Sequence, residues 1–285
     1  MVHTRAGKGT PVEHSGSILR LLVTSLACLA GAAAAHDSWF EPLATARRGE
    51  QWLALGTGNQ FPVRETAISA EYLQVQGCRH ADGSPAALAA LRNTANALIL
   101  RAAGNPAGAL SCWVQLTPFQ IEVAADKVAI YLDEVRPAQP VLDAWATMHA
   151  RGLPWKERYT KHARIELQGA ETQAAVATAP AGMGMDVLLS AAKSPLRTGD
   201  TLGFQLLRDG QPLPDFAVEL RHEGQPAGLW QRTNGTGHLQ FKPVLAGRWL
   251  LRAVDLRLSA TEPDTWDSRF VTLAFSVREG SATQP

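Results

Sequence analysis

The amino-acid sequence predicts a mainly β protein made of two β-rich domains, with one or two short helices between them. Short apolar or alternating runs recur between Gly, Pro, Asn and Asp residues, which is typical of strands and turns. Without residues 1–35, the 285-residue chain keeps 250 residues, the length of two ordinary domains or of one large domain. In the C-terminal half, alternating apolar positions surround a hairpin-type turn at Asn234-Gly235 and predict an antiparallel β-sandwich.

The first 35 residues have the pattern of a cleaved signal peptide. A region with three basic residues precedes an apolar run over 21–35, which ends in Ala33-Ala34-Ala35, the small-residue spacing of a signal-peptidase site. The run is shorter than the roughly 20 residues of a membrane-spanning helix, and no later segment has that character. We therefore predict an exported, periplasmic protein whose mature chain begins at His36 and has no transmembrane segment.

The predicted mature chain is close to neutral. Residues 1–35 contain three of the 27 basic and one of the 26 acidic residues, so 24 and 25 remain. Such a balance gives no electrostatic preference for nucleic acid or for an anionic membrane surface. We therefore expect neither as a partner.

Residues 36–168 are predicted to form the N-terminal β-rich domain. Its expected strands lie near 39–41, 51–57, 71–77, 97–102, 112–116 and 128–132. A helical segment is expected near 140–167, in two parts over 141–150 and 155–167. Pro140 suits a first helical turn, and Gly152 with Pro154 separates the two parts.

Cys78 and Cys112 are the two cysteines of the mature chain, and each lies in a strand-like segment. In an oxidising compartment two such thiols pair, so we predict a disulfide between neighbouring strands. The alternative is a soft metal pair, but no C-x-x-C spacing supports it.

Residues 169–184, rich in Ala, Thr and Gly, are predicted to be a linker, and 185–279 the C-terminal β-sandwich domain. The sandwich prediction depends on period-two alternation: Phe216, Val218 and Leu220 share one strand face, and Ala217, Glu219 and Arg221 share the other.

His36 is the principal candidate for a metal ligand. Cleavage after Ala35 would free its α-amine, which together with the imidazole Nδ1 closes a chelate ring around a metal ion. Nitrogen donors of this kind suit Cu(II) and Ni(II). We expect Asp37 to orient an imidazole of the site. The alternative is that His36 only begins a strand or a frayed terminus.

His222 and His162 are candidates for more distant ligands. His222 continues the apolar strand face that ends at Leu220, and the alternative role is a hydrogen-bonded histidine at the end of a strand. His162 shares a predicted helical face with Trp155 and Tyr159, for which packing is the alternative. The loop over 58–62, followed by Arg64 and Glu65, is a potential border of a site, but no chemical reason favours it.

The sequence contains no self-sufficient catalytic or metal motif. H-x-H, H-E-x-x-H, paired C-x-x-C, G-x-S-x-G, Walker-type and G-x-G-x-x-G patterns are all missing. No pair of carboxylates is singled out for acid–base catalysis either. We assign no catalytic residue and favour a protein that is not an enzyme.

Four phrases resemble a family of exported bacterial proteins of unknown function that is commonly labelled as related to nickel or cobalt uptake. They are AHDSWFEP at 35–42, ERYTKHA at 157–163, GRWLLRA at 247–253 and WDSRF at 266–270. The resemblance implies a periplasmic β-rich protein with an immunoglobulin-like or carboxypeptidase-regulatory-like C-terminal sandwich and a link to transition metals. Many members carry His where this chain has Asp255, which implies weaker nitrogen coordination here.

These observations lead to one function and two alternatives. The first is a periplasmic protein that binds Ni, Co or Cu through His36 and serves as an accessory of an inner-membrane nickel or cobalt uptake system. The second is a sandwich that binds a partner without metal, since sandwich folds host many functions. The third is a copper enzyme with an N-terminal histidine brace, which needs a second imidazole close to His36.

Overall fold

A computed structural model describes residues 36–44, 50–103, 108–169 and 180–280. The predicted signal peptide and most of the predicted linker lie outside these residues. The described chain is mainly β, as predicted, with two α-helices, α1 (Ala125–Val135) and α2 (Gln139–Ala150), and a short 3-10 helix, Ala70–Tyr72. None of the described helices has the length and apolar character needed to cross a membrane.

The first sheet has five antiparallel strands in the order β1-β2-β7-β6, with β3 beside β2. β1 pairs with β2 along its whole length, from the pair Asp37 and Gly58 to the pair Leu43 and Trp52. The strands are β1 (Asp37–Leu43), β2 (Glu50–Gly58), β3 (Thr66–Ala67), β6 (Leu88–Asn93) and β7 (Leu98–Ala103).

The second sheet is the centre of the fold, with nine strands in the order β15-β14-β17-β18-β10-β8-β4-β5 and β9 beside β10. Its strands are β4 (Leu73–His80), β5 (Pro85–Ala86), β8 (Leu110–Leu116), β9 (Phe119–Val123), β10 (Trp155–Leu167), β14 (Ala217–His222), β15 (Leu229–Arg232), β17 (Gly247–Leu258) and β18 (Thr265–Val277). β10 and β18 pair in parallel, so strands from both predicted domains lie in one sheet.

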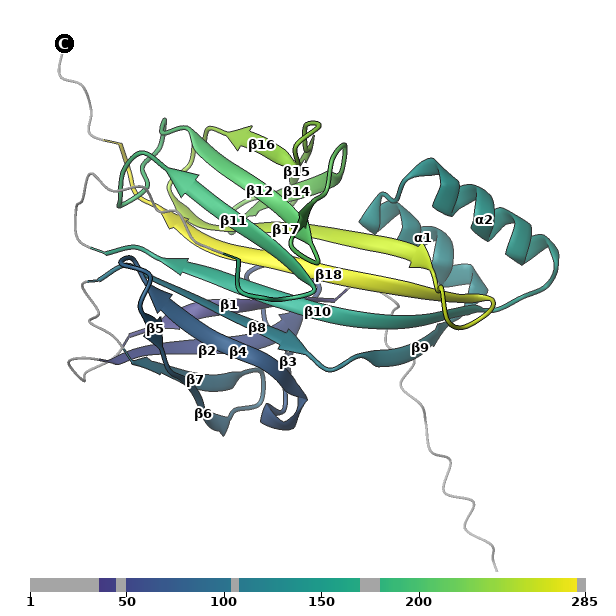
Figure 1. The fold of residues 1–285 in the computed structure, drawn as a ribbon, viewed down its shortest axis with the longest axis horizontal. Coiled ribbons are helices and arrows are strands. Elements are labelled where there is room, and N and C mark those ends of the chain that lie inside the picture. The colour runs from purple at the N-terminus through teal and green to yellow at the C-terminus, as the bar shows by residue number, and fades with distance from the viewer. Residues whose placement is uncertain (1–35, 45–49, 104–107, 170–179, 281–285) are drawn as a thin grey trace, which may run out of the picture. The chain divides into compact units, whose positions relative to one another are not determined.

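The third sheet contains β11 (Met185–Ala191), β12 (Leu202–Arg208), β13 (Gln211–Pro212) and β16 (His238–Phe241). It packs on one face of the central sheet to form the C-terminal sandwich, whose core includes Leu189, Phe204, Trp249 and Val271. The first sheet and the two helices cover the opposite face (Figure 1). The long central strands are therefore buried on both sides.

The segment 155–167, predicted to be helical, is instead the strand β10. One face of this strand carries Trp155, Ala163 and Ile165, and the other carries His162 and Arg164. Both faces are buried, so the alternation of apolar and polar residues does not separate core from solvent. The helical spacing from Trp155 to His162 is therefore incidental.

The segment 128–132, predicted to be a strand, lies within the helix α1. Its apolar run is rich in β-prone residues, but Val128, Tyr131, Leu132 and Val135 recur at helical spacing and are buried together. The neighbouring prediction is confirmed: α2 covers 141–150, and Pro140 lies in its first turn.

The turn at Asn234-Gly235 forms, but it does not close a hairpin. The Asn234 side-chain Oδ1 accepts hydrogen bonds from the backbone N–H groups of Thr236 and His238, at 3.0 and 2.9 Å. The strands on either side, β15 and β16, belong to the central and third sheets. The turn therefore carries the chain from one layer of the sandwich to the other.

The predicted disulfide between Cys78 and Cys112 is confirmed. The two residues lie directly opposite each other on the neighbouring strands β4 and β8, and both are buried. In the chain-entropy model, closing a loop of this length stabilises the folded state by about 4 kcal/mol.

We predict that replacing both cysteines with alanine lowers the free energy of unfolding by about 4 kcal/mol, because the unfolded chain regains the entropy of the open loop. Urea unfolding of the oxidised protein and of the double variant gives this difference. Reductant should destabilise the wild type and leave the double variant unchanged. Equal stability of the two proteins would show that the bridge does not form.

Candidate functional site

His36 directly precedes β1, and its imidazole lies beside a carboxylate. The distance from its Nε2 to Oε2 of Glu65 is 3.5 Å, and the two side chains are 36% and 41% exposed. Glu65 is itself held in place: its backbone N–H donates to the Thr57 carbonyl, and Asn59 Nδ2 donates to its Oε2 at 3.2 Å. A carboxylate beside one imidazole nitrogen orients the ring.

Asp37 does not lie in the position expected for it beside an imidazole. Its side chain is buried, and its Oδ2 is 3.0 Å from Nε of Arg252. Arg252 also donates from Nη1 to Oε2 of Glu219 at 3.0 Å. Asp37 therefore anchors the start of β1 to the central sheet, while Glu65 occupies the place beside His36.

Two further cations surround Asp37. Nη1 of Arg221 is 3.9 Å from the Asp37 carboxylate, and its Nε is 3.1 Å from Glu219. Burial lowers the pKa of Lys161 to about 8, against the opposing effect of the Asp37 charge. This charged cluster, made of Asp37, Lys161, Glu219, Arg221 and Arg252, holds three cations and two carboxylates. Lys161, Glu219, Arg221 and Arg252 were not candidates in the sequence, because nothing local indicated that strands so far apart would bring them together.

His162 lies on the other face of the central sheet. Its partner on β18 is Val271, which belongs to the core of the sandwich. The next residue of β18, Thr272, points to the opposite face, where its hydroxyl donates to the Ser38 carbonyl of β1. Nδ1 of His162 donates to the Phe270 carbonyl at 2.9 Å, and its Nε2 has no hydrogen-bond partner among the described residues. Burial lowers the pKa of His162 to about 4, so its imidazole is neutral near pH 7.

His222 uses both ring nitrogens within the protein. Nε2 donates to the Ala246 carbonyl at 2.9 Å, and Nδ1 accepts the backbone N–H of Gly224 at 3.1 Å. The ring packs on Trp249, with 4.8 Å between the ring centroids. This arrangement is that of a hydrogen-bonded histidine at the end of a strand, and it leaves no nitrogen for a metal.

The structure does not bring the three candidate histidines together. His222 lies opposite Trp249, which pairs with Phe275, whereas His162 lies opposite Val271. That offset of four residues is about 13 Å along the strand. Within the described ranges, no group of three or more His, Cys, Asp or Glu residues could hold a metal ion.

The model for a domain of unknown function, DUF4198, matches residues 33–255, which include His36, Glu65 and the charged cluster. The chain belongs to the DUF4198 family. No curated protein matches the chain.

Solved structures add no functional information about this DUF4198 protein. One match is a chimeric titin Z1Z2-Z1Z2 tandem functionalised with a GRGDS peptide from fibronectin, with 12% sequence identity and a TM-score of 0.14. The match covers 85% of this chain and 100% of that one. A score this low carries no argument about fold or function.

Asp255, where the family resemblance implied histidine in many members, is paired with arginines in this DUF4198 protein. Its Oδ1 accepts a hydrogen bond from Nε of Arg257 at 3.0 Å, and its Oδ2 forms an ion pair with Arg208. It lies opposite Arg269 on the face of the sheet that points into the sandwich. This face is opposite to the one that β1 covers.

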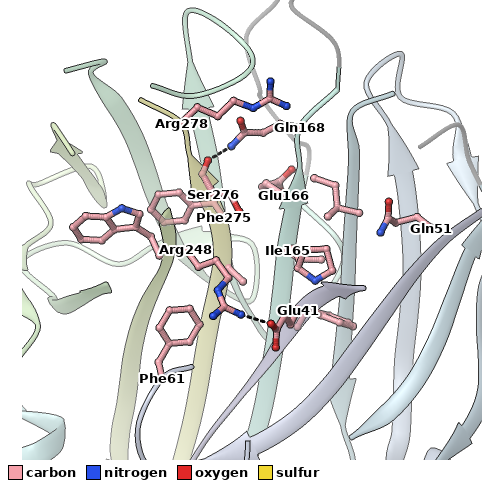
Figure 2. Close-up of a pocket in the computed structure, with 15 residues that line it drawn as sticks. Glu41, Gln51, Phe61, Ile165, Glu166, Gln168, Arg248, Phe275, Ser276 and Arg278 are labelled. Carbon is pink, nitrogen blue, oxygen red and sulfur yellow. Dashed lines mark hydrogen bonds and ion pairs between the residues drawn. The ribbon is translucent and has the colours of Figure 1, made fainter. Parts of the chain in front are cut away.

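A pocket of about 190 Å³ lies beside the C-terminal half of β1 (Figure 2). Its walls include Phe40, Phe61 and Phe275, and the carboxylate of Glu41 lies at one side. Glu41 forms ion pairs with both Arg64 and Arg248, so its charge is balanced within the protein. The pocket is separate from His36, which lies at the opposite end of β1.

We predict that Arg252→Met destabilises the fold by about 3–5 kcal/mol, because the carboxylates of Asp37 and Glu219 lose their buried counter-ion. Urea unfolding measures the change. Arg252→Lys, which keeps a cation beside the two carboxylates but loses the guanidinium fork, should be less destabilising. An Arg252→Met variant as stable as the wild type would contradict the role of this cluster as an anchor.

We predict that His162 makes the fold less stable in acid. Its folded-state pKa lies below the value of about 6.5 in an unfolded chain, so the unfolded state binds more protons as pH falls from 6.5 to 4. This group therefore lowers the free energy of unfolding by up to about 3 kcal/mol over that range. His162→Gln should flatten this part of the stability–pH curve, and His149→Gln, which changes an exposed ring, should not. Parallel curves for wild type and His162→Gln would contradict the prediction.

Proposed function

We propose that the mature chain, beginning at His36, is a periplasmic transition-metal-binding protein that serves as an accessory of an inner-membrane nickel or cobalt uptake system. The observation that carries the proposal is the placement of His36. It lies one residue before an anchored strand, with its imidazole beside the carboxylate of Glu65.

The anchoring matters because a chelate at a chain terminus needs a terminus that is held in place. Asp37 is paired with Gly58 in the ladder between β1 and β2, and its buried carboxylate is bound by Arg252. A frayed terminus would lose backbone entropy on binding a metal, at about 1–2 kcal/mol per residue that becomes fixed. Here the residue after His36 is already fixed, which supports ligand binding over the alternative of a frayed end.

The donor set indicates which metals suit the site. An α-amine and an imidazole Nδ1 are both nitrogen donors, and such donors suit Ni(II), Co(II) and Cu(II). Glu65 lies beside Nε2, where it would keep that nitrogen protonated, so Nδ1 is the ring nitrogen that would bind the metal. Two nitrogens from the chain leave the remaining coordination positions for water or for a partner's groups, which suits a protein that passes its metal on.

The placement of the other histidines restricts the proposal to His36. His222 has both nitrogens in hydrogen bonds, and His162 lies on the opposite face of the central sheet. His80, His149 and His238 lie on β4, α2 and β16. A copper histidine brace needs a second imidazole at the same metal, so these positions favour metal binding and transfer over oxidative catalysis.

We predict that protein starting at His36 binds Ni(II), Co(II) or Cu(II) at least tenfold more tightly than the same protein with one extra alanine before His36. The extra residue converts the amine into an amide and removes one donor. Isothermal titration calorimetry of metal-free samples measures both affinities. Binding should weaken in acid, because protons compete with the metal for nitrogen donors.

Glu65→Gln should weaken the same binding by about tenfold, the usual effect of removing a carboxylate that orients a ligand histidine. Glu71→Gln, which changes an exposed carboxylate elsewhere, is the matched control and should leave the affinity unchanged. Equal affinities for the processed and extended proteins would overturn the proposal and leave a sandwich that binds a partner without metal.

A further inference from the structure

A second pocket, of about 480 Å³, lies between the helices and one end of the central sheet. Figure 1 shows α1 and α2 beside this end of β17. The pocket is lined by the turn that joins the two helices, by the first turn of α2, by residues 213–217 and by residues 254–257 of β17. Its volume falls within the range of roughly 300–1,000 Å³ that is typical of small-molecule sites.

Positive charge is in excess around this pocket. Three arginines line it, Arg136, Arg232 and Arg257, with two aspartates, Asp215 and Asp255. Each aspartate is already paired: Nε of Arg232 is 2.7 Å from Oδ1 of Asp215, and Nε of Arg257 is 3.0 Å from Oδ1 of Asp255. Asp255 also forms an ion pair with Arg208, which does not line the pocket.

Arg136 has no carboxylate partner in the described part of the chain. Its guanidinium lies over the ring of Trp230, 4.5 Å from the centroid, and forms no hydrogen bond or ion pair with the described residues. The residue ends α1 in the left-handed conformation, with a φ of 45°, where glycine is the usual choice. Arginine is therefore not the residue that the backbone favours here, which points to a use for its side chain.

The remaining walls of the pocket are largely apolar. Val141, Leu213, Phe216, Val254 and Leu256 line it together with two prolines. A bare inorganic anion would leave this surface without a partner, whereas a molecule with a hydrocarbon body would cover it. The apolar walls and the arginines therefore select for one kind of ligand.

We propose that this pocket binds a small organic anion that carries two carboxylates on an apolar body. Arg136 receives one carboxylate through its planar guanidinium, and the terminal nitrogens of Arg257 receive the other. The walls around Phe216 and Leu256 cover the hydrocarbon part. The site is independent of His36, since it is formed by α1, α2, β14, β17 and the adjoining loop.

Phthalate is a suitable probe, because it has two carboxylates on an apolar ring. Calorimetry with the mature protein at low ionic strength should show one phthalate bound per chain. Arg136→Gly should weaken this binding at least tenfold and leave the fold intact, because glycine suits the left-handed position. Lys193→Gln removes one exposed positive charge that lies just after β11 and does not line the pocket. It is the matched control and should bind phthalate like the wild type.

Two control compounds test separately whether binding needs the negative charge and whether it needs the apolar ring. Phthalamide, with the same ring and no charge, and inorganic phosphate, with charge and no apolar body, should each bind at least tenfold more weakly than phthalate. The proposal is overturned if phthalate does not bind, if Arg136→Gly binds it as well as the wild type, or if either compound matches it. Protein with an extra residue before His36 should bind phthalate normally, so this result does not depend on the metal site.

Discussion

The buried ion pair between Asp37 and Arg252 is the interaction on which the proposed site depends. Arg252 lies near the middle of β17, where its guanidinium reaches Asp37 of the first sheet and Glu219 of β14. Its Nη2 also donates to the Glu134 carbonyl of α1, at 3.4 Å. One side chain thus joins three neighbouring elements, and it fixes the first residue of β1 directly after His36.

Burial on both faces of the central sheet explains why so many charges lie inside this protein. On the face opposite the first sheet, Arg164 of β10 is fully buried, with Nε 2.9 Å from Glu166 and Nη1 2.9 Å from Asp186. On the other face, Glu157 accepts hydrogen bonds from Tyr131 and Trp155, at 2.9 and 2.8 Å. Burial nevertheless raises the pKa of Glu157. These polar groups are satisfied by partners on β10 itself, on β11 and on α1, as buried charges must be.

Local sequence patterns were sufficient to predict an element when one of its faces is exposed to solvent. They were also sufficient to predict the pairing of two cysteines in an oxidising compartment. The disulfide between Cys78 and Cys112 and the helix α2 were predictable on these grounds. The period-two alternation of β14 was also predictable, although Glu219 on its polar face is buried. The strand β10 was not, because its charged face is buried and resembles a solvent face. The helix α1 was not either, because its β-prone composition conceals its helical spacing.

The residues of the candidate site also divide into those that a local sequence pattern indicated and those that only the fold brings together. His36 stood out because of its position after a small-residue cleavage pattern, which is a local signal. Glu65 lay in a loop that had no chemical reason to be preferred, and its relation to His36 appears only when β2 and the following loop fold back beside β1. Asp37 was expected to orient an imidazole, whereas its carboxylate lies 3.0 Å from Nε of Arg252, and no short-range pattern indicates a partner 215 residues later in the chain.

A crystal structure of the processed protein, soaked with Ni(II) and measured at the nickel absorption edge, tests the central claim most directly. The proposed site predicts an anomalous peak bound by the α-amine and Nδ1 of His36, with Glu65 still beside Nε2. A peak at any other position, or none at His36 when the chain demonstrably begins there, would contradict it.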